Sequence, residues 1–250
     1  MSYKRIATVT CLTFYALLGV ALLQVDYAAI PPIALAVSIP LALFLADFLS
    51  GLVHVFLDYY PINGKAGFDR MYVYSGKRNS DEFKALRRAV YVHPDARLID
   101  HLAYSFKIHH DRPRAMNRKI YPVHVFETVI PASVVVLLSF AAPPAIAFTL
   151  AVAGFLVANV QFIHACVHDT PRSRVWKPVI HRLQRWHVMY SARTHGIHHR
   201  EGVSNFCLVT GWANPLLNPL FRLMLRVGIA DRYHWAPPGA PLPQPGTLDD

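Results

Sequence analysis

Residues 128–168 read TVIPASVVVLLSFAAPPAIAFTLAVAGFLVANVQFIHACVH, without a single lysine, arginine, aspartate or glutamate. A helix needs about 20 apolar residues to cross a bilayer, so this stretch is long enough for two crossings. Pro143 and Pro144 interrupt it, and proline ends a helix because it lacks the backbone N–H donor. The stretch therefore predicts a helical hairpin of two transmembrane spans joined by a tight turn.

Two further spans are predicted upstream of this hairpin. Residues 6–25 and 27–46 contain no charged residue, and the apolar character continues to about residue 57. The first of these segments is long for the apolar part of a signal peptide and shows no clear cleavage site, so we expect it to be retained. We therefore expect an all-α integral membrane protein with four transmembrane helices, at about residues 6–25, 30–57, 125–141 and 145–168.

The composition agrees with a membrane protein. Hydrophobic residues make up 54% of the chain and charged residues 16%, whereas charged residues make up about 25% of an average soluble domain. The net charge of +10 could suit a nucleic-acid binder. The basic residues are, however, partitioned by the membrane segments, so we expect no nucleic-acid partner. Cys11, Cys166 and Cys207 show no paired spacing, so no disulfide scaffold is expected.

The basic residues are confined to one side of the predicted spans. All 25 lysines and arginines lie in residues 4–5, 58–127 and 169–250, and the two turns on the other side contain none. The positive-inside rule then places both termini, the long loop and the histidine-rich segments in the cytoplasm. We expect one membrane-embedded domain at residues 1–236, followed by a Pro-rich, disordered tail at residues 237–250.

Histidines gather at the cytoplasmic ends of these spans. In a helix, the HGIHH motif at residues 195–199 would place three imidazoles on one face, and imidazole is the commonest metal ligand in proteins. Taken alone, this motif could also be a surface turn rich in histidine. We expect the cytoplasmic loop, the C-terminal region and the nearby span ends to form a histidine-rich cap on the membrane helices. Ten histidines in this cap are candidate ligands: His54, His109, His110, His124, His164, His168, His187, His195, His198 and His199.

Ten ligands are too many for one ion, because a structural zinc takes four and a catalytic zinc takes three plus water. The set suits two ions with four or five nitrogen ligands each, leaving one or two histidines to support the others. The adjacent His109 and His110 fit such a dinuclear centre, because neighbouring helical residues point about 100° apart. Zinc, copper, iron and nickel all accept imidazole, so ligand type does not choose the metal.

Three acidic residues are predicted to support the ligands or to move protons. Asp47 is an ionisable residue inside a spanning helix, which is a functional hypothesis by default; a helix-end anchor is the alternative. Asp58 lies four residues after His54, so these two could also grip a metal together. Glu127 shares a helical face with His124 and is expected to orient it.

A pair of metal ions held by histidines at the end of membrane helices suggests iron and dioxygen chemistry on a lipid. Oxidation of an unactivated C–H bond requires chemistry that side chains do not supply. One alternative is a zinc-dependent lipid hydrolase, which would need only three or four of the histidines. A metal transporter is less consistent with the sequence, because its ligands would lie near the bilayer midplane. Hydroxylation by the same kind of centre stays open.

Seven segments occur in an order that resembles a known family: residues 46–54 (ADFLSGLVH) with Asp58, 109–113 (HHDRP), 124–127 (HVFE), 164–168 (HACVH), 186–188 (WHV), 195–199 (HGIHH) and 206–212 (FCLVTGW). Each motif is weak alone, but the ordered set is specific. It resembles the lipid desaturase family that contains plasmanylethanolamine desaturase and its bacterial CarF relatives.

The resemblance implies a di-iron desaturase that uses O2 as co-substrate and electrons from an external donor of the cytochrome b5 or ferredoxin type. The implied substrate is a membrane phospholipid with an alkyl-ether chain, whose desaturation forms the vinyl ether of plasmalogens. Plant relatives desaturate an acyl chain instead, so an acyl-chain substrate is the alternative. Residues 65–104 are longer than expected for the family, in a place where a headgroup or an electron donor could dock.

Overall fold

The computed structural model describes residues 3–168 and 176–235, which form helices and turns with no β-strand among them. Four helices are long and apolar enough to cross a membrane, and the predicted all-α class with four spanning helices is confirmed. They are α1 (Tyr3–Leu23), α2 (Pro32–Tyr59), α6 (Tyr121–Ser139) and α7 (Pro144–His168). The predicted tail at residues 237–250 lies outside the described residues.

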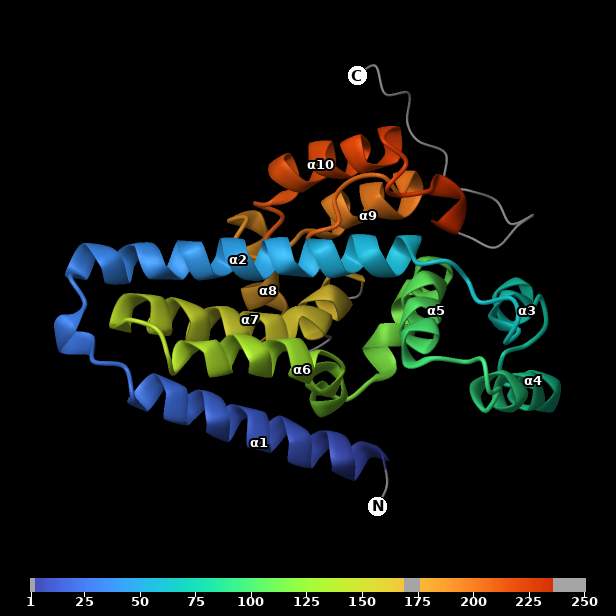
Figure 1. Ribbon diagram of the computed structural model, residues 1–250, viewed down its shortest axis with the longest axis horizontal. Helices are drawn as coiled ribbons and strands as arrows, with labels where there is room; N and C mark the ends of the chain where they lie inside the picture. Colours follow the sequence, from blue (N-terminus) through green and yellow to red (C-terminus); the bar gives the residue numbers. More distant parts are fainter. Residues whose placement is uncertain (1–2, 169–175, 236–250) are drawn as a thin grey trace.

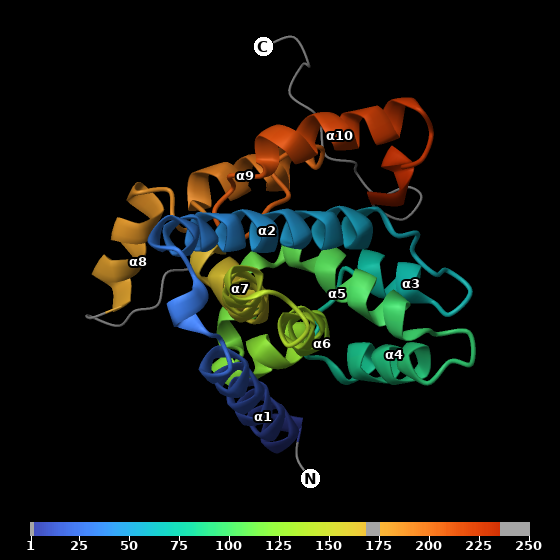
Figure 2. The same cartoon turned by 60° about the vertical axis from the view of Figure 1, so that its left-hand side comes forward.

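The four long helices lie side by side in the order α2, α7, α6, α1 (Figures 1 and 2). Helices α6 and α7 form the hairpin predicted from the paired prolines, with its turn at residues 140–143. A short turn of 3-10 helix, η1 (Tyr27–Ala29), joins α1 to α2. Buried apolar side chains from all four spans, among them Phe14, Ala46, Val125 and Ala158, form one core cluster.

Close approach of α6 and α7 depends on Gly154. A Cβ atom at this position would lie 2.4 Å from Cγ2 of Val136 and 3.3 Å from the carbonyl oxygen of Ala132. Small residues let membrane helices pack backbone to backbone, which replaces the hydrophobic driving force that lipid surroundings remove. The hydroxyl of Thr128 also donates to the carbonyl oxygen of Ala158 at 2.8 Å, so the hairpin is both closely packed and hydrogen-bonded.

Shorter helices lie at one end of this bundle and along the outer side of α2 (Figure 1). Four lie between α2 and α6: α3 (Phe68–Val73), α4 (Asp81–Tyr91), α5 (Leu98–Asp111) and η2 (Pro113–Arg118). Four follow α7: α8 (Trp176–Arg185), α9 (Ala192–Glu201), α10 (Asn214–Arg226) and η3 (Arg232–Trp235). Ser80 caps α4 by accepting a hydrogen bond from the backbone N–H of Phe83 at 3.2 Å, as is typical of serine at the start of a helix.

Asp47 joins α2 to the segment that leads into α10. Its Oδ1 atom accepts hydrogen bonds from the backbone N–H groups of Val209, Thr210 and Gly211, at 2.9, 2.8 and 3.1 Å. Its Oδ2 atom accepts from the backbone N–H of Ala213 at 3.0 Å. The carboxylate is fully buried, and these four donors replace the hydration that burial removes.

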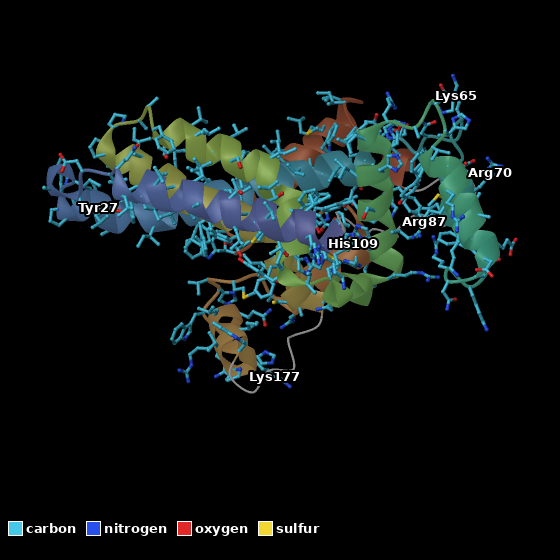
Figure 3. The ribbon with its side chains drawn as sticks, turned by 90° about the horizontal axis from the view of Figure 1, so that it is seen from below. Tyr27, Lys65, Arg70, Arg87, His109 and Lys177 are labelled. Carbon is cyan, nitrogen blue, oxygen red and sulfur yellow. The ribbon has the colours of Figure 1, made fainter. Side chains whose placement is uncertain are left out.

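His109 and the basic residues between α2 and α6 lie at the same end of the molecule. Figure 3 shows Tyr27 at one end of the long helices and Lys65, Arg70 and Arg87 at the other, on the same side as His109. The basic residues of the loop between α2 and α6 thus lie at the same end of the long helices as His109, and Tyr27 lies at the opposite end.

Candidate metal centre

Four helices converge on the candidate centre, and each contributes side chains from neighbouring positions or from positions one turn apart. The structure brings together eight of the ten predicted histidines and one carboxylate. These are His54 and Asp58 on α2, His109 and His110 on α5, His164 and His168 on α7, and His195, His198 and His199 on α9. The candidate ligands on α2, α5 and α7 all lie near the ends of their helices, so the candidate centre lies where the long helices meet the shorter ones.

The first group consists of five histidines whose ligand nitrogens lie within 4.8 Å of one another: His109, His164, His168, His195 and His199. The Nε2 atom of His195 lies 2.8 Å from that of His164, 3.1 Å from that of His168 and 3.0 Å from that of His199. Ligands at right angles around an ion with bonds of about 2.1 Å lie about 3.0 Å apart. The spacing therefore fits nitrogens that share one metal ion.

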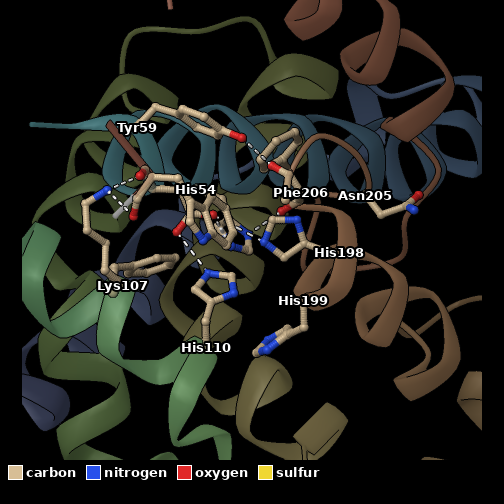
Figure 4. Close-up of polar contacts among 12 residues, drawn as sticks. His54, Tyr59, Lys107, His110, His198, His199, Asn205 and Phe206 are labelled. Atoms are coloured by element: carbon tan, nitrogen blue, oxygen red, sulfur yellow. Dashed lines mark hydrogen bonds and ion pairs between the residues drawn. The ribbon is translucent and has the colours of Figure 1, made fainter. Parts of the chain in front are cut away.

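The second group consists of His54, Asp58, His110 and His198, also within 4.8 Å of one another. Oδ2 of Asp58 lies 3.1 Å from Nε2 of His54 and 3.2 Å from Nε2 of His198. Oδ1 of the same carboxylate lies 3.1 Å from Nε2 of His110 (Figure 4). Because the Asp58 side chain is fully buried, its charge calls for a cation, and a metal ion within this group would supply one.

The two groups adjoin each other. His109 and His110 are adjacent in sequence but belong to different groups, and so are His198 and His199. The ring centroids of His110 and His199, one from each group, lie 4.4 Å apart. This division of neighbouring side chains suits a centre of two closely spaced ions.

Backbone carbonyls orient three of the imidazoles through their Nδ1 atoms: His54 to Phe206 at 2.7 Å, His198 to Ser204 at 2.8 Å, and His109 to Phe106. A carbonyl oxygen only accepts, so Nδ1 carries the proton and Nε2 presents its lone pair to the site. These three Nε2 atoms are buried and make no hydrogen bond within the described chain. Buried Nε2 atoms that present their lone pairs to the site are what a metal ion requires.

The surroundings keep the imidazoles of His109, His195, His198 and His199 neutral. Burial lowers the pKa of His198 to about 3 and the pKa of His199 to about 2, and the neighbouring imidazoles add to the effect. The pKa values of His109 and His195 lie well below their usual range for the same reasons. Since metal ligation requires neutral imidazole, these side chains are in the binding form at physiological pH.

Two residues that the sequence did not single out close the second group. The buried ammonium of Lys107 donates to the backbone carbonyl of Asp58, and to those of His234 and Trp235 at 2.6 and 3.2 Å. The Trp235 ring lies 4.4 Å from that of His110 and 5.8 Å from that of His198. Lys107 thus holds η3 over the site. The sequence held no signal for this, because a lysine beside two histidines is equally typical of an exposed helix face.

Two of the predicted ligands lie outside both groups. His124 is buried in α6, where its ring packs 6.3 Å from that of Phe162 on α7. His187 is exposed and adopts a left-handed backbone conformation, with φ of 57°, in the turn after α8.

The acidic candidates divide into different roles. Asp58 lies among the histidines of the second group, at the spacing of four residues from His54 that would let the two bind one metal ion. Asp47 binds the backbone of residues 209–213 and so positions the segment that follows the Phe206 carbonyl. Glu127 forms an ion pair with Lys119 at 2.6 Å.

A comparison with protein-family models gives one match, to a lipid desaturase domain over residues 90–227. This region includes the ligands from α5, α7 and α9 but not those from α2. Searches of curated proteins and of solved structures returned no match. The family match covers more than half of the 250-residue chain, and the protein therefore belongs to the lipid desaturase domain family.

Proposed function

We propose that this protein is an O2-dependent di-iron lipid desaturase that forms the vinyl-ether double bond of plasmalogens from a plasmanyl phospholipid. The observation that carries this proposal is the pair of adjoining ligand groups, which contain eight histidines and one carboxylate. Family membership supports the reaction class. The vinyl-ether product rests on the resemblance of the seven sequence motifs to plasmanylethanolamine desaturase.

Bound iron would supply the one-electron and dioxygen chemistry that a C–H bond requires. In the balanced reaction the lipid loses two hydrogens from adjacent carbons. Together with two electrons and two protons, these reduce O2 to two waters and leave a double bond. The electrons come from an external donor of the cytochrome b5 or ferredoxin type. The protein's own contribution is to hold the ligands in a fixed orientation and to shield them from water.

The rival functions fit this geometry less well. A zinc hydrolase needs three protein ligands and an open position, and would leave a second group of four without a role. A transporter would place its ligands near the middle of the bilayer, whereas both groups lie at one end of the spanning helices. Desaturation of an acyl chain in place of an alkyl chain remains the alternative within the same family.

A lipid chain has a route to this region along α7. A groove of about 680 Å³ lies between α7 and α8 and is lined mainly by apolar side chains, including Phe155, Leu156, Leu183 and Met189. Ile163, also in its lining, directly precedes the first-group ligand His164. We place this end of the bundle, with both termini, on the cytoplasmic side by the positive-inside rule, and treat residues 1–236 as one membrane-embedded domain.

The test combines metal analysis with lipid mass spectrometry. Purified protein should contain about two irons per chain, as expected for a dinuclear site. A host that expresses the protein in air should accumulate lipids that release an aldehyde in acid, which marks a vinyl ether, and an anaerobic host should not. A single zinc per chain, with a lipid product that forms equally well without oxygen, would overturn the proposal.

A further inference from the structure

The geometry points to a phosphate-binding pocket beside the first group, which receives the phosphate of the phospholipid substrate. A pocket of about 240 Å³ lies between α4, α5 and η2, and four of its lining residues are cationic: Arg78, Arg87, Arg112 and Lys119. His109 also lines it. We call this the basic pocket. This inference rests on the proposed function for its substrate, but its chemistry is visible in the pocket itself.

The positive charge of the basic pocket is largely uncompensated. Lys119 is paired with Glu127 at 2.6 Å. No described carboxylate lies within ion-pair distance of the three arginines, and the described lining contains no aspartate or glutamate. Arginines gathered without acidic partners repel one another and attract an anion, and the planar guanidinium suits the paired oxygens of a phosphate.

Arg78 is fixed in place without being neutralised. Its guanidinium donates to the hydroxyl of Tyr104 at 2.6 Å and to the backbone carbonyls of Met71 and Tyr72, each at 3.0 Å. Its Nε atom is buried and has no hydrogen-bond partner in the described chain. All of its partners are uncharged acceptors, so the structure holds a cation at the pocket wall and leaves its charge available.

The position of the basic pocket limits how far the reacting bond can lie from the phosphate of the headgroup. His109 belongs to both the pocket lining and the first group, so a phosphate in this pocket lies close to the metal centre. In an alkyl-ether phospholipid, only the glycerol backbone and its oxygens separate the phosphate from the first carbons of the chain. A phosphate held here would therefore place the bond next to the ether oxygen at the centre, and a bond far along a chain would lie too distant.

The test compares two neighbouring arginines on α4. Both are exposed, but Arg87 lines the basic pocket and Arg88 does not, so Arg87→Glu and Arg88→Glu make the same charge change one residue apart. Binding to the full chain in detergent is measured by calorimetry under argon, with three probes: an alkyl-ether lysophospholipid, the matching alkylglycerol without phosphate, and inorganic phosphate. Melting temperature and iron content establish that each variant is folded and loaded.

We expect the unmodified protein to bind the lysophospholipid about tenfold more tightly than the alkylglycerol, as one or two charge-assisted hydrogen bonds would give. Arg87→Glu should abolish this preference, Arg87→Gln should reduce it, and Arg88→Glu should retain it. Equal affinities for the two lipids, or equal effects of the Arg87 and Arg88 variants, would overturn the inference. So would inorganic phosphate that binds as tightly as the lipid and displaces it.

The binding measurement tests the basic pocket independently of the proposed desaturation. Binding under argon involves no turnover, so a preference that depends on Arg87 supports the basic pocket even if no vinyl ether forms in the host. Conversely, a protein that makes vinyl ethers but accepts alkylglycerol as readily as phospholipid would retain the proposed function and lose the pocket. A slower reduction by cytochrome b5 in Arg87→Glu, with lipid affinity unchanged, would assign the surface to the electron donor and overturn the inference.

Discussion

The Nε2 atom of His198 on α9 lies 3.2 Å from Oδ2 of Asp58 on α2, with both side chains fully buried. His54 approaches the same oxygen at 3.1 Å and His110 approaches the other oxygen at 3.1 Å. One carboxylate thus contacts imidazoles from three helices. Such an arrangement is stable in a buried site when a metal ion shares the charge, because an uncompensated buried carboxylate is costly.

Replacement of Asp58 by asparagine tests this arrangement. The amide keeps the shape of the side chain but removes the charge that would balance an ion, so we expect iron to fall from about two to about one per chain and desaturation to be lost. Asp95→Asn is the control, because Asp95 is 61% exposed and remote from both groups. An Asp58→Asn protein that keeps both irons would exclude Asp58 as a ligand.

The division of His198 and His199 between the groups predicts two different single-iron proteins. His198→Ala should retain iron in the group of five histidines, and His199→Ala should retain it in the group that contains Asp58. Their Mössbauer spectra should differ because the remaining ligands differ in number and type. His181→Ala, at an exposed position on α8, should keep both irons. Identical spectra from the two α9 variants would show that the groups are not separate.

Asp47 is expected to act on stability rather than on catalysis. Asp47→Asn leaves one oxygen and replaces the other with an NH2 group, which cannot accept the bond from Ala213. The loss of a charged acceptor should cost about 1.5–3 kcal/mol, seen as a lower melting temperature in detergent. Asp26→Asn is the control, because Asp26 is exposed and accepts from two backbone N–H groups at the opposite turn. An unchanged melting temperature for Asp47→Asn would contradict this role.

The α6–α7 hairpin offers a rescue experiment. Gly154→Ala should destabilise the protein by about 1–3 kcal/mol, because the added methyl group meets Cγ2 of Val136 and overpacks the interface. Val136→Ala removes that atom, so the double variant should recover most of the loss. Gly19→Ala, on α1 with open space around it, should be neutral or slightly stabilising. A double variant no more stable than Gly154→Ala would place the clash elsewhere.

The cap should weaken in acid through Asp100. Burial raises the pKa of this carboxyl, but hydrogen bonds from Arg97 and Asn63 outweigh it and leave the pKa below its usual range. A lowered folded-state pKa contributes stability above the unfolded pKa, and that contribution is lost as pH falls through the folded value. The stability difference between the unmodified protein and Asp100→Asn should therefore shrink below pH of about 4. A difference that stays constant in acid would contradict this account.

The sequence by itself determined the fold class and the location of the site. Spans depend on local composition, so the uncharged stretches and the paired prolines at Pro143 and Pro144 were enough to predict four helices and the hairpin. The site follows from the same pattern, because histidines near span ends must meet where the ends meet. The helix that carries the HGIHH motif is also bounded by local signals, since Ser191 caps α9 at its start and Gly202, with φ of 68°, ends it.

Only the tertiary structure decided which residues meet. Periodicity shows which face of a helix a side chain occupies, but not which other helix that face contacts. His124 and His187 have the same side chain as the ligands and yet lie outside both groups, while Asp58 lies inside one. Asp47 binds backbone N–H groups far along the chain, and the arginines of the basic pocket come from separate segments. Each of these contacts depends on how the helices pack, and that is a property of the whole chain.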